Sequence, residues 1–271
     1  MINKREWKTE GLSVIGASHI KKGMPNQDSI SFGGDAPCFV SVADGHGGRK
    51  YIRSHIGSHF ATIAIGEIIE ETAYMTADMS DIEETIRHIK SRFLLNWQDK
   101  VDDDIRDNPF TEEELDMHPD LEQKPRTAYG TTFLAAIAYD ELVLVLGHGD
   151  GDAIGLFDDM AEDLLEEDAR NFGGHTLSLA SLFDASEICH NVLIGKIPSV
   201  ITLFTDGIKN SYNDTNLDEI EKFYKIPLAI KTSLKKKEDL QVGLGALLNQ
   251  VTTYGSGDDV TAGVLYDAEA I

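Results

Sequence analysis

Aspartates stand where apolar segments of the chain begin or end. Asp44 follows the apolar run 39–43 and opens the turn Asp44-Gly45-His46-Gly47-Gly48. Others repeat the pattern: Asp206 after 200–205, Asp150 and Asp152 after 142–146, and Asp258 and Asp259 before 260–266. A carboxylate at the end of a buried strand costs free energy unless a positive group compensates it. Because Mg²⁺ and Mn²⁺ take oxygen ligands, the pattern predicts a divalent metal site that activates water and holds a phosphoryl oxygen.

Taken singly, most of these segments have a simpler explanation. Asp206-Gly207 after a strand is typical of a plain turn, because Asp and Gly both favour turn geometry. Residues 149–152 have a weak similarity to a calcium-binding loop, but the twelve-residue pattern and its terminal Glu are missing. The turn 44–48 is more specific, since three glycines and a histidine directly follow an apolar strand.

Apolar runs and their spacing predict the elements that must position these carboxylates. Runs typical of β-strands lie at 12–17, 29–32, 38–43, 132–139, 142–146, 153–157, 200–204 and 260–266, with a hairpin turn at 139–141. Apolar residues at steps of three and four predict helices at 48–71, at 80–101 with a capping box at Ser80, and at 239–252. Two consecutive long helices depart from the rhythm of a doubly wound parallel sheet. The order therefore predicts one α+β layered domain over residues 1–271.

Composition argues against several classes of function. The chain has 271 residues, 41% of them hydrophobic, and a formal net charge of -23. Such a charge repels phosphate backbones and anionic lipids, so neither nucleic acid nor a membrane is an expected partner. The cluster Lys231, Lys235, Lys236 and Lys237 is interpreted as a solvated helix face. Because no apolar run reaches the ~20 residues of a membrane span and no signal core follows Met1, we expect a soluble, cytoplasmic protein.

The order of the motifs resembles that of a known enzyme family. The motifs are Asn26-Gln27-Asp28-Ser29, Asp44-Gly45-His46-Gly47-Gly48, Gly130-Thr131-Thr132, Gly149-Asp150, Thr205-Asp206-Gly207 and Asp258-Asp259-Val260-Thr261. In order and approximate spacing they resemble the metal-dependent protein serine/threonine phosphatases, the PPM or type 2C family, over nearly the whole chain. The opening segment 18–28 is most similar to bacterial branches. The resemblance implies a four-layer α-β-β-α sandwich with two antiparallel sheets around a central metal site.

The same resemblance implies a ligand set for two Mg²⁺ or Mn²⁺ ions, and for a third ion found in bacterial relatives. Five residues would provide the ligands: Asp44, Gly45, Asp206, Asp258 and Asp150. Asp44 would bridge two ions, the carbonyl of Gly45 would bind one of them, and Asp206 and Asp258 would complete the other. The third ion would use Asp206 with Asp150, and Asp152 is the alternative.

A hydrolytic mechanism follows from the resemblance. Water between the two ions would attack a phosphoserine or phosphothreonine monoester on a protein, and Asp28 would orient metal-bound water. His46 matches the residue that protonates the leaving alkoxide. The alternative for His46 is a purely structural role, in which the imidazole orients Asp44.

Two departures from the family pattern affect the metal and the phosphate. Gln27 stands where many members carry a Glu that contacts a metal, which predicts weaker metal binding. The upstream arginine that clamps phosphate in many relatives is missing, and only Lys21 and Lys22 are available for that role. A solvated surface role for these two lysines is the alternative. Residues 158–191 correspond to a variable flap beside the cleft and are expected to influence substrate choice.

Three functions fit these residues. The first is a Mg²⁺- or Mn²⁺-dependent protein serine/threonine phosphatase acting on phosphoproteins. The second is a non-catalytic signalling or binding module on the same fold, which Gln27 and the missing arginine favour. The third is a hydrolase of small phosphoesters, which would use the same metals. Metal-dependent turnover separates the first from the second, and a substrate panel separates the first from the third; the sequence indicates no oligomeric state.

Overall fold

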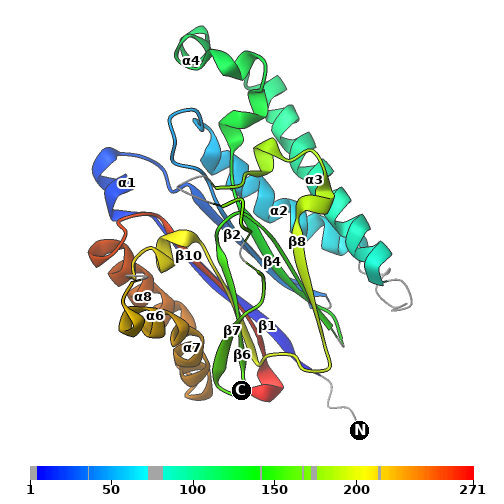
Figure 1. Ribbon diagram of the computed structural model, residues 1–271, viewed down its shortest axis with the longest axis vertical. Coiled ribbons are helices and arrows are strands. Elements are labelled where there is room, and N and C mark those ends of the chain that lie inside the picture. Colours follow the sequence, from blue (N-terminus) through cyan, green and yellow to red (C-terminus); the bar gives the residue numbers. More distant parts are fainter. Residues whose placement is uncertain are drawn as a thin grey trace.

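Two antiparallel β-sheets lie between layers of helices in the computed structural model, which describes residues 5–35, 37–72, 82–140, 142–166, 168–171, 176–212 and 215–271 (Figure 1). Sheet A has the strand order β1 (Trp7–Val14), β10 (Val260–Asp267), β9 (Val200–Phe204), β6 (Asp152–Phe157) and β7 (Met160–Asp163). Sheet B has the order β2 (Asp28–Gly33), β3 (Cys38–Asp44), β4 (Phe133–Ala138), β5 (Leu142–His148) and β8 (Cys189–Ile194).

Helices cover the outer face of each sheet. Sheet B is covered by α2 (Ser54–Thr72) and α3 (Ile82–Asp107), and sheet A by α6 (Leu217–Tyr224), α7 (Ile226–Lys235) and α8 (Leu240–Tyr254) (Figure 1). The remaining α-helices of the described residues are short: α1 (Ala17–Lys22), α4 (Glu112–Met117) and α5 (Asp206–Lys209). This arrangement confirms the predicted α+β sandwich with four layers.

Alternating side chains of the strands build a separate apolar core in each space between layers. In β3, Phe39 packs toward α2 and α3, whereas Val40 packs between the two sheets. In β9, Phe204 packs toward the helices of sheet A, whereas Leu203 packs between the sheets. Because successive residues of a strand point to opposite faces, a strand buried on both faces reads as one continuous apolar run. The predicted strands are therefore runs of this kind.

Some elements differ from the prediction. The first strand covers 7–14 instead of 12–17, and residues 17–22 form α1. Strands β7 and β8 were not predicted, because they are edge strands with exposed or half-exposed side chains. Helix α6 was also not predicted. The proposed cap at Ser80 lies outside the described residues.

The lysine cluster only partly matches its interpretation as a solvated face. Lys235, Lys236 and Lys237 are exposed, but Lys231 is buried, and its Nζ lies 2.7 Å from Oδ1 of Asp159. The interpretation as a solvated residue was therefore wrong for Lys231. Its alkyl chain is buried, and its ammonium group forms an ion pair with the exposed carboxylate of Asp159.

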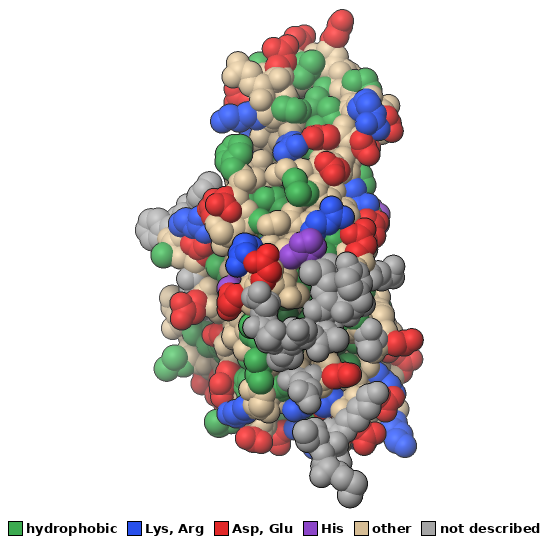
Figure 2. All heavy atoms as spheres, turned by 90° about the vertical axis from the view of Figure 1, so that its right-hand side faces the viewer, with side chains coloured by type: hydrophobic (Ala, Val, Ile, Leu, Met, Phe, Trp, Pro, Cys, Tyr) green, Lys and Arg blue, Asp and Glu red, His purple; other side chains and the backbone are tan. Residues whose placement is uncertain are grey.

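The outer surface over α3 carries charges of both signs. Figure 2 shows this face, where acidic and basic side chains lie interspersed. Ion pairs contribute to the pattern, such as Arg106 with Asp103 at 2.7 Å and Arg126 with Asp102 at 2.6 Å. Within the described residues, none of the helices combines the length and the apolar composition needed to cross a bilayer.

Candidate metal centre

The predicted carboxylates meet at one end of the sandwich. Asp28 begins β2 and is the register partner of Asp44, which ends β3. Asp206 begins α5, two positions after the last residue of β9, and Asp258 lies two positions before the first residue of β10. A cavity of about 310 Å³ opens there. Six of the predicted site residues line it: Asp44, Gly45, His46, Asp150, Asp206 and Asp258.

Hydrogen bonds from the start of β4 hold the backbone of the Asp44 turn. The hydroxyl of Thr131 and the N–H of Thr132 both donate to the carbonyl of Asp44 at 2.8 Å. The N–H of Asp44 donates to the Thr132 hydroxyl at 3.0 Å, and the N–H of His46 donates to the carbonyl of Gly130 at 3.0 Å. The motif 130–132 therefore fixes the direction in which the Asp44 and His46 side chains leave the turn.

Gly45 is required by close packing of backbone on both sides. A Cβ at this position would lie 2.6 Å from the carbonyl oxygen of Gln27 and 2.7 Å from that of Ser54. Neither oxygen can move without shifting a strand start or the first turn of α2. The glycine thus lets the Asp44 turn lie between these two segments.

We expect Gly45→Ala to destabilise the metal-free protein by about 1–3 kcal/mol, the usual cost of overpacking. The matched control is Gly243→Ala in α8, because a Cβ on Gly243 meets nothing within 4 Å. Alanine there should stabilise the helix by about 0.5–1 kcal/mol. Urea unfolding in the presence of a chelator measures both. Equal effects of the two substitutions would contradict the close packing of Gly45.

The cavity concentrates negative charge. Burial, followed by the nearby Asp28 and Asp206, raises the pKa of Asp44 well above its usual value. Burial, Asp150 and Asp258 raise the pKa of Asp206, although hydrogen bonds from Asp44 and from Asn210 at 2.9 Å oppose the shift. No Lys or Arg belongs to the part of the lining that the structure describes. A divalent cation would supply the missing positive charge, so these residues fit the metal that the motif pattern predicts.

Asp28 lies behind the cavity wall. Its Oδ2 accepts hydrogen bonds from the hydroxyls of Thr205 at 2.8 Å and Thr261 at 2.7 Å. Its Oδ1 is buried and accepts no hydrogen bond from the described residues. Burial raises the pKa of Asp28 to about 8, with further contributions from Asp259 and Asp206. Its position directly behind Asp44 suits the predicted role of orienting water through the free oxygen.

Comparisons with known proteins show the family of the chain. The family model of protein phosphatase 2C matches residues 15–244. The chain belongs to the protein phosphatase 2C family. Members of this family depend on metal ions. No curated protein sequence matches the chain.

Solved structures of this phosphatase 2C fold cover almost the whole chain. PppA, a key regulatory component of T6SS in Pseudomonas aeruginosa, matches with a TM-score of 0.62 and 15% identity over 98% of this chain and 100% of its own. Stp1, a serine/threonine phosphatase from Staphylococcus aureus, matches with a TM-score of 0.60 and 13% identity over 96% of this chain and 94% of its own. The catalytic domain of the serine/threonine phosphatase PstP, solved with two manganese ions, matches with a TM-score of 0.55 and 15% identity over 96% of this chain and 98% of its own. Both named source organisms are bacteria, in agreement with the bacterial resemblance.

In this phosphatase 2C fold, Asp150 and Asp152 have different surroundings. Asp150 lines the cavity with Asp44, and its Oδ2 accepts a hydrogen bond from the hydroxyl of Thr176 at 2.6 Å. Asp152 does not line that cavity, and its Oδ1 lies 2.7 Å from Nζ of Lys209. Of the two residues, only Asp150 therefore shares this cavity with the other predicted ligands, and its binding of a third ion stays a prediction.

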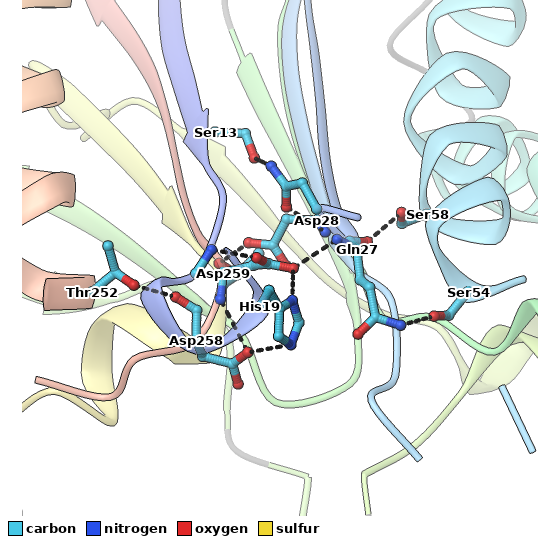
Figure 3. Close-up of polar contacts among 12 residues, drawn as sticks. Ser13, His19, Gln27, Asp28, Ser54, Ser58, Thr252, Asp258 and Asp259 are labelled. Carbon is cyan, nitrogen blue, oxygen red and sulfur yellow. Dashed lines mark hydrogen bonds and ion pairs between the residues drawn. The ribbon is translucent and has the colours of Figure 1, made fainter. Parts of the chain in front are cut away.

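Three residues of the cavity lining carry contacts that were not predicted. The Nδ1 of His19 lies 2.8 Å from Oδ2 of Asp259, which also accepts the N–H of Gln27 at 2.6 Å (Figure 3). The side-chain Nε2 of Gln27 donates to the hydroxyl of Ser54 at 2.6 Å, and its Oε1 accepts no hydrogen bond from the described residues. His19 and Asp259 are 240 positions apart, so no local spacing indicates their contact.

The two lysines predicted to bind phosphate lie elsewhere. Lys21 and Lys22 end helix α1, and both are exposed. Neither belongs to the lining of the 310 Å³ cavity. Contact with a substrate phosphate therefore stays a prediction for both lysines, and the lining itself offers only His19 and His46 as groups able to carry positive charge among the described residues.

Proposed function

We propose that the chain hydrolyses phosphoserine and phosphothreonine monoesters on proteins with the help of two Mg²⁺ or Mn²⁺ ions. The observation that supports this most is the convergence of Asp44, Asp150, Asp206 and Asp258 in one cavity without a neighbouring Lys or Arg in its described lining. Membership of the phosphatase 2C family adds support, as does the structural similarity to Stp1 and PstP, which are serine/threonine phosphatases.

Each residue of the centre has a defined task in this proposal. Asp44 and the carbonyl of Gly45 would hold one ion, Asp44 with Asp206 and Asp258 the other, and Asp150 with Asp206 a third. When bound, the ions supply a nucleophilic water and neutralise the phosphoryl oxygens. Asp28 accepts hydroxyl hydrogens on one oxygen and keeps the other free to orient water.

His46 would donate the proton that the leaving serine or threonine alkoxide needs. Its ring lies against that of Tyr51, with 4.8 Å between centroids and an interplanar angle of 55°. A Cβ on Gly130 would lie 2.9 Å from Cδ2 of His46, so the ring is packed on this side as well. Packing against Tyr51 and Gly130 holds the imidazole in the cavity lining, beside the proposed metal ligands.

Replacing His46 by Asn is expected to affect substrates unequally. We expect kcat/KM for a phosphothreonine peptide to fall about 10²–10⁴-fold, the range for loss of a general acid. For p-nitrophenyl phosphate, whose phenolate leaves without a proton, we expect a fall of less than about 10-fold. Steady-state kinetics on both substrates measure the difference. Equal losses would assign His46 the alternative role of orienting Asp44.

The flap segment 158–191 would influence which phosphoproteins enter. It contacts two of the site motifs: Thr176 donates to Asp150, and the N–H of Leu179 donates to the carbonyl of Thr131 at 2.9 Å. Asn171 donates to the carbonyl of Gly149 at 2.7 Å. Substitutions in this segment would therefore alter the contacts that hold Asp150 and the Asp44 turn.

Turnover after metal removal and replacement tests the proposal. Purified protein is treated with a chelator and titrated with Mn²⁺ or Mg²⁺, using phosphothreonine and phosphoserine peptides beside p-nitrophenyl phosphate and a cyclic nucleotide. We expect peptide hydrolysis that requires metal. Hydrolysis of the small esters alone would indicate a small phosphoester hydrolase.

A non-catalytic binding module is the second candidate. It is favoured by the neutral Gln27 and by the missing arginine that would clamp a substrate phosphate, since the described cavity lining contains none. PppA, with the same fold, is described as a regulatory component. Absence of turnover on every substrate at millimolar metal, with the metal bound, would favour this candidate.

A further inference from the structure

In the cavity lining, a ring nitrogen of His19 and a carboxylate oxygen of Asp258 face each other. His19 lies on α1 and is 7% exposed, and Asp258 directly precedes Asp259 and β10. Both line the 310 Å³ cavity. The candidate ligand atoms of His19, Asp258 and Asp259 all lie within 4.8 Å of one another (Figure 3).

Asp259 determines which nitrogen of His19 carries a proton. Its Oδ1 accepts the N–H of Gly16 at 2.5 Å, and its Oδ2 accepts the N–H of Gln27 at 2.6 Å. With backbone donors on both oxygens, this buried carboxyl group acts as an acceptor, so the contact of 2.8 Å to Nδ1 of His19 requires a proton on Nδ1. In the neutral form of the ring, the lone pair then lies on the other nitrogen, Nε2.

Nε2 lies opposite a carboxylate oxygen of Asp258. Nε2 is 3.6 Å from Oδ1 of Asp258, which is too long for a hydrogen bond. Two neighbouring ligand atoms bound to one octahedral ion at about 2.1 Å lie about 3.0 Å apart, so a small movement of the exposed Asp258 side chain would let both atoms bind one cation. A histidine that donates one N–H to a carboxylate and turns its other nitrogen to a metal is a common arrangement in metalloproteins.

We propose that Nε2 of His19 and the carboxylate of Asp258 bind the same ion of the metal centre, with Asp259 orienting the imidazole. The inference rests on the proposed function, because it adds a nitrogen ligand to the centre of carboxylates. A second observation supports a ligand set that includes more than carboxylates. Gln27 is buried and belongs to the lining of the same cavity, and its Oε1 accepts no hydrogen bond from the described residues. An imidazole ligand favours Mn²⁺ and later transition metals over Mg²⁺.

Pulsed EPR of bound Mn²⁺ tests the assignment without any measurement of activity. The full chain is labelled with ¹⁵N-histidine and loaded with Mn²⁺, and the spectrum is searched for the coupling of a directly bound imidazole nitrogen. His19→Asn keeps an N–H donor near the position of Nδ1 for Asp259 but removes Nε2. His46→Asn is the matched control, because it removes the other imidazole of the cavity.

We expect the coupling in the wild type and in His46→Asn, and its loss in His19→Asn. Calorimetry should show the Mn²⁺ dissociation constant of His19→Asn increased about 10–100-fold, with a smaller change for Mg²⁺. Bound Mn²⁺ without nitrogen coupling in the wild type would overturn the His19 assignment and leave the proposed function standing, whatever the folding of the variants. Coupling that is lost only in His46→Asn would also overturn it. Failure of Mn²⁺ to bind at all would overturn both proposals.

Discussion

Replacing Asp44 by Asn should abolish metal-dependent turnover while leaving the metal-free fold at least as stable as the wild type. Asp44 is the proposed bridge between two ions, so we expect kcat/KM to fall by at least about 10³-fold, the scale of losing one strong electrostatic stabiliser. In the metal-free protein, the Asp44 carboxylate destabilises the folded state, because burial and the nearby Asp28 and Asp206 raise its pKa. An asparagine removes the charge and keeps a donor for Asp206.

The sign of the stability effect depends on pH. A carboxyl whose pKa is raised on folding destabilises the folded state at pH values above its usual pKa, where the unfolded chain is ionised. With chelator at pH 8, we expect Tm of Asp44→Asn to equal or exceed that of the wild type, and the difference should shrink at pH 4. Asp158→Asn is the matched control, because Asp158 is an exposed residue outside the cavity lining. A strongly lowered Tm for Asp44→Asn alone would indicate a structural role.

Divalent metal should bind more tightly as pH rises from 6 to 9, and its binding should release protons. The pKa of Asp28 is about 8 because of burial and the nearby Asp259 and Asp206, and the pKa values of Asp44 and Asp206 are also raised. Cations favour ionised carboxylates, so protons must leave as metal binds. Below these pKa values, the association constant should rise about tenfold per pH unit for each proton released.

Calorimetry in buffers of different ionisation enthalpy counts the released protons. Asp28→Asn should reduce the number at pH 7. Without metal, thermal stability should fall as pH rises from about 4 toward 8, because the folded state binds more protons than the unfolded chain over that range. Saturating Mn²⁺ should reverse this trend. A metal affinity that is independent of pH would contradict the raised pKa values.

The central strands could be predicted from the sequence because they are buried on both faces. In β3 and β4, residues such as Val40 and Ala136 face the other sheet while Phe39 and Phe133 face the helices, so apolar residues run without interruption. The edge strands lack this signal. β7 is mostly exposed, and its place follows from pairing with β6, a tertiary contact that no local pattern contains.

Helix α6 had a local signal that could have found it. Asn216 caps the helix by accepting the N–H of Asp218, and acidic residues fill the first turn. This combination is typical of a helix start. Lys231 had no such signal, because its ion pair with Asp159 joins residues 72 positions apart in the chain.

The candidate site also has residues that the sequence predicted and contacts that it could not predict. Asp44, Asp206 and Asp258 were predicted because each stands beside an apolar run, and the lining of one cavity now contains all three. The contact of His19 with Asp259 depends on the docking of α1 against the start of β10, which is a property of the folded chain. Sequence reasoning could name the carboxylates but could not supply the contacts that orient them.

Anomalous diffraction from crystals soaked in Mn²⁺ tests most directly whether these carboxylates hold catalytic ions. We predict two peaks inside the cavity lined by Asp44, Asp206 and Asp258, both within about 2.0–2.6 Å of an Asp44 carboxylate oxygen. An empty cavity at millimolar Mn²⁺, or peaks that do not contact Asp44, would contradict the proposed metal centre.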